Sequence, residues 1–401
     1  MNSKIYTEIL LKEFSLELDE ICAWWCTHAF DTENGGLYGE IGDDNSVNKQ
    51  ADKGGNLYGR SLWFFSTVAK HLNSEVYRKH AESIYHYMLD HFVDKEHGGV
   101  FWTVDAKGTL VNSKKQLFVQ AFMIYGLSAY YKLTSDEEAL DLALSVFNLI
   151  ESKARDTVNQ GYLTVCDRDW SGQENAVLED EINALKIMDT HLHLCEAYTE
   201  LYEACGSERV AYAIRHCLDC FDKHLIDKEN RYLRADLTAD WKDRSKFKIY
   251  GHNLECGWLI WKAVKVLKDK ELEDNFRPRI LQLVDNCMKE GMGKFGEVFE
   301  SYIFESKTLV ADRAWWMQAE AMNGFLNAYE LTNDEKYYES FLKSWNFIKQ
   351  YQKDKINGEW HWNSVLDNIA PPKKNKVCNF KTPYHNGRAM MLSYNRLRSL
   401  D

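Results

Sequence analysis

Proline is almost absent from this sequence, and its absence narrows the folds that the chain can adopt. The 401 residues include four prolines, and the first of them is Pro278. Proline lacks a backbone donor and clashes with the preceding helical turn, so it breaks helix interiors. The first 277 residues contain no proline, so they can be helical throughout. The sequence therefore favours an all-α protein.

Two kinds of helical segment alternate along the chain. The segments with wide apolar faces at three-to-four spacing are residues 60–72, 119–132, 191–204 and 316–329. Residues 135–153 and 335–350 instead place apolar side chains on one face and charged ones on the other. The first pattern is typical of buried helices and the second of surface helices. We therefore predict a repeating order of inner and outer helices.

Short turns rich in glycine and aromatic residues punctuate the chain six times. They lie at residues 34–38, 97–102, 160–163, 230–233, 293–296 and 357–360. Their spacing of roughly 60 to 70 residues suits a helical pair with a long loop, and the β-prone residues after them indicate short β-hairpins. Six such units predict about twelve helices, closed into one (α/α)6 barrel that forms a single domain over residues 1–401. An open α-solenoid has the same local signature.

The net charge and the cysteines indicate which binding partners and which cellular compartment to expect for this protein. Asp and Glu outnumber Lys and Arg by 61 to 49, which gives a formal charge of −12. Such a surface repels phosphate backbones and anionic lipids, so we expect neither nucleic acid nor a membrane as a partner. The N-terminus lacks the apolar core of a signal peptide, no apolar run is long enough to cross a bilayer, and the ten cysteines are scattered. We expect free thiols and a cytoplasmic protein.

Histidines gather at the starts of predicted inner helices. His191 and His193 open one apolar segment, His252 with Glu255 opens another, and His385 opens the last. A single histidine is most often structural, but three clusters at helix starts favour one shared pocket. No HExxH motif and no paired CxxC motif accompanies them, which argues against a metal site.

Two further features indicate a polar, aromatic pocket. Arg60 opens an apolar helix, where a buried guanidinium needs a carboxylate or a substrate oxygen as its partner. Trp315 and Trp316 are adjacent, so they cannot face the same side of a helix. Either one of them leaves the buried face and stacks on a sugar ring, or the whole helix is buried.

Five longer motifs in a fixed order resemble one known family. They are Ala-Asp-Lys-Gly with the following Arg60, Lys-Ile-Met-Asp-Thr-His-Leu-His at 186–193, Tyr-Gly-His-Asn-Leu-Glu at 250–255, Arg-Ala-Trp-Trp-Met-Gln-Ala-Glu at 313–320, and Pro-Tyr-His-Asn-Gly-Arg at 383–388. Over residues 34–388 the chain resembles the N-acylglucosamine 2-epimerase superfamily, and within it the cellobiose 2-epimerases. The resemblance implies an (α/α)6-barrel isomerase that interconverts glucose- and mannose-configured reducing ends at C2. It implies a small sugar as the partner, and neither a metal nor another cofactor.

The resemblance also implies residue roles. His252 and His385 are the expected acid/base pair, because epimerisation removes a weakly acidic proton from one face of C2 and returns one to the other. Arg60 and His193 are expected to stabilise the cis-enediolate. Glu255 and Glu320 would orient histidines or bind hydroxyls, Trp258 and Trp316 would wall the subsite, and the further expected substrate contacts are Tyr58, Phe118, Asp189, Phe380 and Arg388.

Three positions depart from the cellobiose 2-epimerase pattern. Phe380 replaces a tryptophan that stacks on the second sugar, Asp189 replaces an asparagine, and Phe118 replaces a tyrosine. These changes favour activity on free mannose or glucose, alone or beside activity on a cellobiose-type disaccharide.

The sequence leaves other functions open. The nearest alternatives are a mannose–fructose type aldose–ketose isomerase and an N-acylglucosamine 2-epimerase. An (α/α)6 glycoside hydrolase would use Glu255 or Glu320 with a second carboxylate, and it would leave the histidines unexplained. A non-catalytic binding module comes last. We expect a monomer or a weak homodimer.

Overall fold

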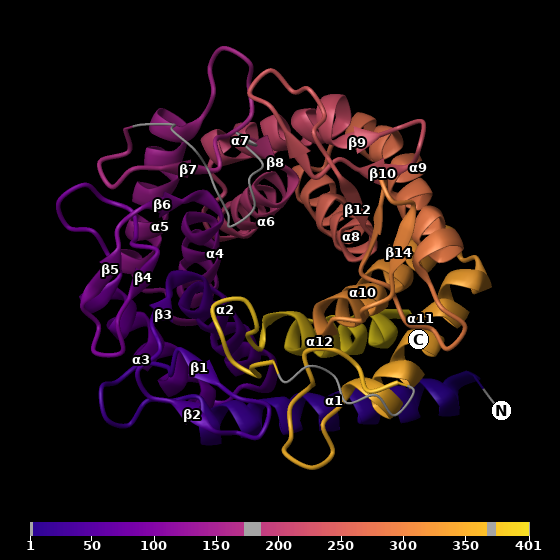
Figure 1. The fold of residues 1–401 in the computed structure, drawn as a ribbon, viewed down its shortest axis with the longest axis horizontal. Coiled ribbons are helices and arrows are strands. Elements are labelled where there is room, and N and C mark those ends of the chain that lie inside the picture. Colours follow the sequence, from indigo (N-terminus) through magenta and orange to yellow (C-terminus); the bar gives the residue numbers. More distant parts are fainter. Residues whose placement is uncertain (1–2, 172–185, 367–373, 401) are drawn as a thin grey trace.

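A computed structural model describes residues 3–171, 186–366 and 374–400, and within them twelve α-helices alternate between an inner and an outer ring (Figure 1). The inner helices are α2 (Gly55–Leu72), α4 (Leu117–Thr134), α6 (Met188–Cys205), α8 (Tyr250–Leu267), α10 (Trp315–Thr332) and α12 (Tyr384–Leu400). The outer helices are α1 (Ser3–His28), α3 (Glu75–His91), α5 (Glu137–Leu149), α7 (Glu208–Cys220), α9 (Lys270–Asn286) and α11 (Glu335–Phe347).

The inner ring closes on itself. Each inner helix packs against the next in chain order, and α12 packs against α2. Each of the inner helices α2 to α10 also packs against the outer helix that follows it, while α1 packs against α12, so the two ends of the chain complete the sixth pair. This arrangement confirms the predicted (α/α)6 barrel and excludes the open solenoid. None of the helices in the described part combines the length and the apolar character that crossing a bilayer requires.

The two helix types follow the two sequence patterns. In α4 every residue from Leu117 to Tyr130 is buried, whereas the outer helix α5 buries one face only. Aspartates Asp136, Asp269 and Asp334 cap the N-termini of α5, α9 and α11 by accepting backbone N–H bonds.

The outer helix α9 contains Pro278, which a helix interior normally rejects. Pro278 and Asp274, whose carbonyl loses its helical partner, are both exposed, so water can satisfy that carbonyl.

Outer helices α5, α7, α9 and α11 each run into a π-helical turn. These turns are η1 (Ile150–Ala154), η2 (Phe221–Leu225), η3 (Cys287–Gly291) and η4 (Ile348–Gln352). Four of the glycine- and aromatic-rich turns follow these π-helical turns, and the first two follow α1 and α3. The six predicted positions all form tight antiparallel pairs, such as Phe30 with Leu37 and Val93 with Val100.

The strands are short and antiparallel, and they lie in the loops that lead into the inner helices. They are β1 (Glu40–Ile41), β2 (Val47–Asn48), β3 (Lys53–Gly54), β4 (Thr103–Val104), β5 (Leu110–Asn112), β6 (Lys115–Gln116), β7 (Val165–Cys166), β8 (Lys186–Ile187), β9 (Ile226–Asp227), β10 (Tyr232–Leu233), β11 (Asp236–Leu237), β12 (Phe247–Ile249), β13 (Ser301–Ile303) and β14 (Thr308–Val310). Several pairs, among them β3–β4 and β6–β7, join neighbouring repeats rather than one hairpin. The loops thereby tie the helical pairs together around the ring.

A buried ion pair recurs beneath the turns. In five of the six turns an aspartate accepts backbone N–H bonds from the residues two and three positions later; these are Asp31, Asp94, Asp156, Asp227 and Asp354. Four of these aspartates also meet a lysine that precedes the next inner helix, in the pairs Lys53–Asp31 (2.9 Å), Lys115–Asp94 (2.8 Å), Lys186–Asp156 (2.9 Å) and Lys376–Asp354 (2.7 Å). The Lys53 of the Ala-Asp-Lys-Gly motif is therefore structural.

The fourth residue of five inner helices binds the backbone of a turn. These residues are Tyr58, Gln120, His191, Asn253 and Gln318, and each accepts an N–H bond of 2.7–3.2 Å from a residue in the turn or just after it. This position corrects the expectation that Tyr58 contacts substrate. Its hydroxyl bonds Leu37, and its ring is fully buried against Tyr87 and Phe92. His191 is likewise a structural histidine.

Candidate active site

One cavity of about 220 Å³ lies at the N-terminal ends of the inner helices. Its lining residues are Asn56, Arg60, Phe118, Asp189, His193, His252, Glu255, Trp315, Trp316, Trp362, Phe380 and His385. All six inner helices contribute to it, so their positive dipole ends converge on the space. A pocket built in this way favours negative charge on a ligand or an intermediate. The structure thus brings His193, His252 and His385 together, as the sequence predicted.

His252 and His385 are the two cavity histidines with lowered pKa values. Burial lowers the pKa of His385 to about 3, although the Glu320 carboxylate, 2.8 Å from Nδ1, opposes the shift. Burial also lowers the pKa of His252 to about 4, against the pull of Asp189. The His252 ring packs 4.9 Å from the ring of Trp316. Both imidazoles are neutral at pH 7, and each can accept a proton.

His193 differs from the other two because carboxylates hold both of its ring nitrogens. Nδ1 lies 2.9 Å from Glu196 and Nε2 lies 3.2 Å from Asp189. Burial alone would lower its pKa, but Asp189 and Glu196 outweigh burial and raise the pKa of His193 to about 9. His193 is therefore a cation at pH 7. Its ring contacts Phe122, and the Arg60 guanidinium lies over the same phenyl ring. The cavity thus holds two cations near one another.

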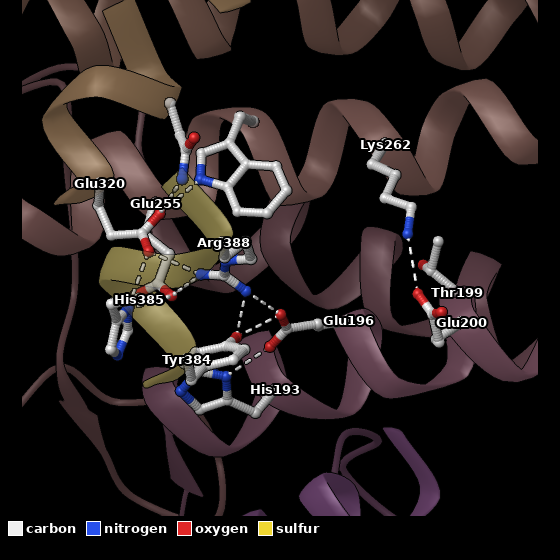
Figure 2. A network of polar contacts seen from close by, with 12 residues as sticks. His193, Glu196, Thr199, Glu200, Glu255, Lys262, Glu320, Tyr384, His385 and Arg388 are labelled. Carbon is white, nitrogen blue, oxygen red and sulfur yellow. Dashed lines mark hydrogen bonds and ion pairs between the residues drawn. The ribbon is translucent and has the colours of Figure 1, made fainter. Parts of the chain in front are cut away.

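Arg388 organises the carboxylates beneath the cavity. Figure 2 shows its guanidinium between Glu196 on one side and Glu255 and Glu320 on the other. One guanidinium nitrogen lies 2.9 Å from Glu255 and 2.7 Å from Glu320. Burial and the Glu320 charge together raise the pKa of Glu255. Burial would also raise the pKa of Glu320, but Arg388 and His385 outweigh it and lower that pKa. Glu255 therefore holds its proton to higher pH than Glu320 does.

Three predicted substrate contacts lie behind the cavity wall instead of on it. Trp258 is buried and donates its indole N–H to Glu320 at 2.7 Å, so it supports that carboxylate and does not wall the subsite. Arg388 and Glu320 are buried in the same layer. The Glu320 carboxylate lies 2.8 Å from Nδ1 of His385, and its expected role in orienting that histidine stays a prediction.

The outer part of the cavity is aromatic. Trp315 packs 4.5 Å from Trp362, and Phe380 packs 6.4 Å from Phe118. Helix α10 is buried nearly all round, as the second interpretation of this pair expected, and both Trp315 and Trp316 line the cavity. Stacking of either ring on a sugar stays a prediction.

The loop that carries Phe380 is fixed to α2. Asn56 donates to the Asn379 carbonyl at 2.9 Å, and Arg60 donates to the Phe380 carbonyl at 3.0 Å. A Cβ atom on Gly54 would lie 1.9 Å from the Asn379 side chain, so this close approach requires glycine.

Sequence reasoning missed Asn56 and Trp362. Asn56 is the second residue of its inner helix, as Phe118, Asp189, Trp316 and His385 are of theirs. Aligning the six helix starts would have identified it. Trp362 lies in a loop after the last turn, where no repeat pattern points to it.

Two groups of side chains in the described residues could offer three metal ligands, and cations already engage both. In the group Glu255, Glu320 and His385, Arg388 bonds each carboxylate. In the group Asp43, Asp354 and His361, Lys376 bonds Asp354 at 2.7 Å. Neither donor set fits a metal without losing an ion pair.

Comparison with known proteins identifies relatives along almost the whole chain. Residues 36–388 match the family model of N-acylglucosamine 2-epimerase. A cellobiose 2-epimerase from Ruminococcus albus is 35% identical, over 96% of this chain and 98% of that protein. The structure of a cellobiose 2-epimerase from Bacillus thermoamylovorans superposes with a TM-score of 0.92 at 34% identity, covering 97% of this chain and 100% of that one. A D-mannose isomerase from Marinomonas mediterranea is 23% identical over 92% of this chain and 93% of that protein.

Proposed function

Since the chain belongs to the N-acylglucosamine 2-epimerase family and is a carbohydrate 2-epimerase, we propose that His252 and His385 exchange the proton at C2 of a glucose- or mannose-configured reducing end. The observation that carries this proposal is the pairing of two neutral imidazoles with one imidazolium around a single cavity. Acid/base chemistry next to a carbonyl needs both forms, because a neutral group removes the proton and positive charge stabilises the oxyanion.

The proposed reaction begins with opening of the sugar ring. The C1–O5 bond breaks while O1 gives its proton to one imidazole and O5 takes a proton from water, which leaves an open-chain aldehyde, one charged imidazole and a hydroxide ion. The other, neutral imidazole then removes the proton from C2, and the electron pair moves to O1 to form a cis-enediolate. The charged imidazole protonates C2 from the opposite face. The ring of the inverted aldose then closes: O1 takes the proton that the second imidazole removed from C2, and O5 returns its proton to the hydroxide, so that both imidazoles are neutral again. The reverse reaction exchanges the two histidines.

The remaining charged groups of the cavity suit the enediolate. Arg60 and the cationic His193 would stabilise its negative oxygens, as would the converging helix N-termini. Glu320 would stabilise the His385 imidazolium while it carries the proton, because its carboxylate already bonds Nδ1. Bonding at Nδ1 leaves Nε2 of His385 as the nitrogen that exchanges protons with substrate.

The glycosidase alternative has little support in this arrangement. Such enzymes place two carboxylates across the scissile bond. Here Glu255 and Glu320 both bond one guanidinium nitrogen of Arg388 from the same side of the cavity floor, and Glu320 does not line the cavity.

We also propose free mannose or glucose as a substrate beside a cellobiose-type disaccharide, because Phe380 offers the outer subsite a smaller face than tryptophan. The closed inner ring supports one domain over the chain. The ten free cysteines support a cytoplasmic location, and we propose a monomer or weak homodimer as the working form.

A single experiment tests the function. The enzyme is incubated in D2O with glucose, mannose, cellobiose and N-acetylglucosamine separately, and the products are followed by proton NMR and mass. Epimerisation at C2 gives the other epimer with one deuterium at C2 and an intact disaccharide. Deuterium at C1 with a ketose product would indicate an aldose–ketose isomerase, and splitting of cellobiose would indicate a hydrolase. Absence of exchange at C2 with every sugar would refute the proposal. A parallel sample dialysed against a strong chelator is expected to keep its activity.

A further inference from the structure

Asp189 faces two of the three cavity histidines with one carboxylate oxygen. It is the second residue of α6, and its Oδ1 lies 3.2 Å from Nε2 of His193 and 3.6 Å from Nε2 of His252. The first distance is a hydrogen bond, whereas the second is longer than one. The lone pair of His252 therefore stays available for a proton from substrate. The Asp189 side chain is 38% exposed, so a sugar in the cavity can reach it.

The charged groups around this contact come from five inner helices. They are Arg60 on α2, His193 and Glu196 on α6, His252 and Glu255 on α8, Glu320 on α10, and His385 and Arg388 on α12. Glu196 holds the far nitrogen of His193, and Glu320 holds His385. Among the carboxylates of the described residues, Asp189 is the one that lies within 4 Å of a ring nitrogen of His252. It thus links the proposed oxyanion-stabilising histidine with one of the proposed acid/base histidines.

We propose that Asp189 is a positioning residue that sets the charge of both histidines at once, keeping His193 protonated and making His252 a stronger base. This inference rests on the proposed function, and it goes beyond binding of a sugar hydroxyl by the same side chain. An amide at this position would reach the same atoms, but it would supply no charge. A carboxylate 3–4 Å from an imidazole favours the protonated ring even where solvent partly screens it.

The two histidines respond to Asp189 in the same direction. Burial lowers the pKa of each ring, and Asp189 is the largest influence opposing burial in each case. The outcome differs because Glu196 assists Asp189 at His193 and no second carboxylate bonds His252 in the described residues. When His252 takes the C2 proton, Asp189 already lies beside the new imidazolium. The positive charge can then form without movement of the chain.

The matched test is Asp189→Asn, which keeps the size of the side chain and removes its charge. Both histidine pKa values fall in this variant. The acid limb of the kcat/KM profile requires neutral His252, and the alkaline limb requires charged His193. Both limbs should therefore move to lower pH, the alkaline limb by about one unit or more and the acid limb by up to about one unit, where the pKa of His385 becomes the limit. Asp43→Asn is the control, because Asp43 lies 3.2 Å from His361 outside the cavity, and its profile should match the parent.

Two outcomes would overturn the proposal. One is a raised KM with both limbs unmoved, which would make Asp189 a hydroxyl-binding residue alone. The other comes from NMR titration of the imidazole Cε1–H signals in the unmutated protein, assigned with His193→Asn and His252→Asn. This titration needs no turnover, so it separates failure of the inference from failure of the proposed function. The expected result is a pKa of about 9 for His193 and about 4 for His252, and the pKa of His193 should fall in Asp189→Asn. Equal values for His193 in the parent and in Asp189→Asn would refute the inference.

Discussion

Buried carboxylates pair with buried cations in two regions of this barrel, beneath the turns and beneath the cavity. The number of carboxylates for each cation differs between the two regions. Under the first turn Asp31 accepts two backbone N–H bonds and pairs with Lys53 alone. Under the cavity Glu196, Glu255 and Glu320 share the guanidinium of Arg388. The same kinds of group therefore give one balanced pair in the first region and an excess of carboxylate in the second.

This difference in charge balance distinguishes a structural ion pair from a site suited to acid/base chemistry. Burial would raise the pKa of Asp31, but the backbone bonds and Lys53 outweigh it and lower the pKa, so the pair stays charged and fixed. Under the cavity the pKa of Glu255 rises while that of Glu320 falls, because the two compete for one cation. Neighbouring groups whose pKa values are driven apart are typical of acid/base sites.

The largest effect is expected from breaking a balanced pair. Lys53→Met leaves Asp31 buried without its cation, and this should lower the free energy of unfolding by about 3–5 kcal/mol. Lys49→Met removes a lysine that pairs with Glu33 on the surface of the same loop, and it should leave the urea midpoint nearly unchanged. Equal midpoints for the two variants would show that burial does not decide the strength of these pairs.

Removing a cavity histidine should act on catalysis and spare stability. His252→Asn and His385→Asn should each lower kcat/KM on the order of 10²-fold or more, because one face of C2 loses its acid/base group. His191→Asn is the matched control, since Asn253 already fills the equivalent position of α8 and accepts the same kind of backbone bond. Steady-state rates and urea midpoints of the three variants test the separation. Normal turnover in either cavity variant would contradict the assignment.

Sequence alone predicted the ring because every repeat carries the same local signals. The turns at 34–38 and 97–102 and the alternation of apolar and amphipathic helices depend on neighbours in the chain. The floor of the cavity depends instead on contacts between residues far apart in the sequence. Arg388 bonds Glu255, which is 133 residues away, and Glu320, which is 68 residues away. Motif membership also does not say which way a side chain faces. For that reason Tyr58 and Trp258 were wrongly expected to touch substrate.

Glu320→Gln tests the uneven charge under the cavity directly. The amide can still accept a bond from His385, but it no longer stabilises the imidazolium, so kcat should fall roughly ten- to hundredfold with KM little changed. The Glu320 carboxylate raises the pKa of His385 against burial. Its loss lowers that pKa further, which NMR titration of the His385 imidazole should detect, while the acid limb of the kcat profile stays where the higher pKa of His252 sets it. An unchanged pKa of His385 together with the kcat of the parent would show that Glu320 only fills space.

The smallest effect concerns the mouth of the cavity and the length of the substrate. Phe380 is 47% exposed, and its backbone carbonyl is fixed by Arg60, so Phe380→Trp should change the ring and leave the loop in place. A larger aromatic face can add ~0.5–1.5 kcal/mol of stacking, and only a disaccharide reaches far enough to gain it.

The ratio of kcat/KM for cellobiose to that for mannose should therefore rise in Phe380→Trp by a few-fold up to roughly tenfold, the size of a 1.4 kcal/mol change. Phe295→Trp, at an exposed phenylalanine that does not line the cavity, controls for added surface tryptophan and should leave the ratio unchanged. If the ratio also stays unchanged in Phe380→Trp, or if the parent is inert on free hexoses, Phe380 does not decide substrate length. The specificity would then lie with the other aromatic residues of the cavity wall, which are Phe118, Trp315, Trp316 and Trp362.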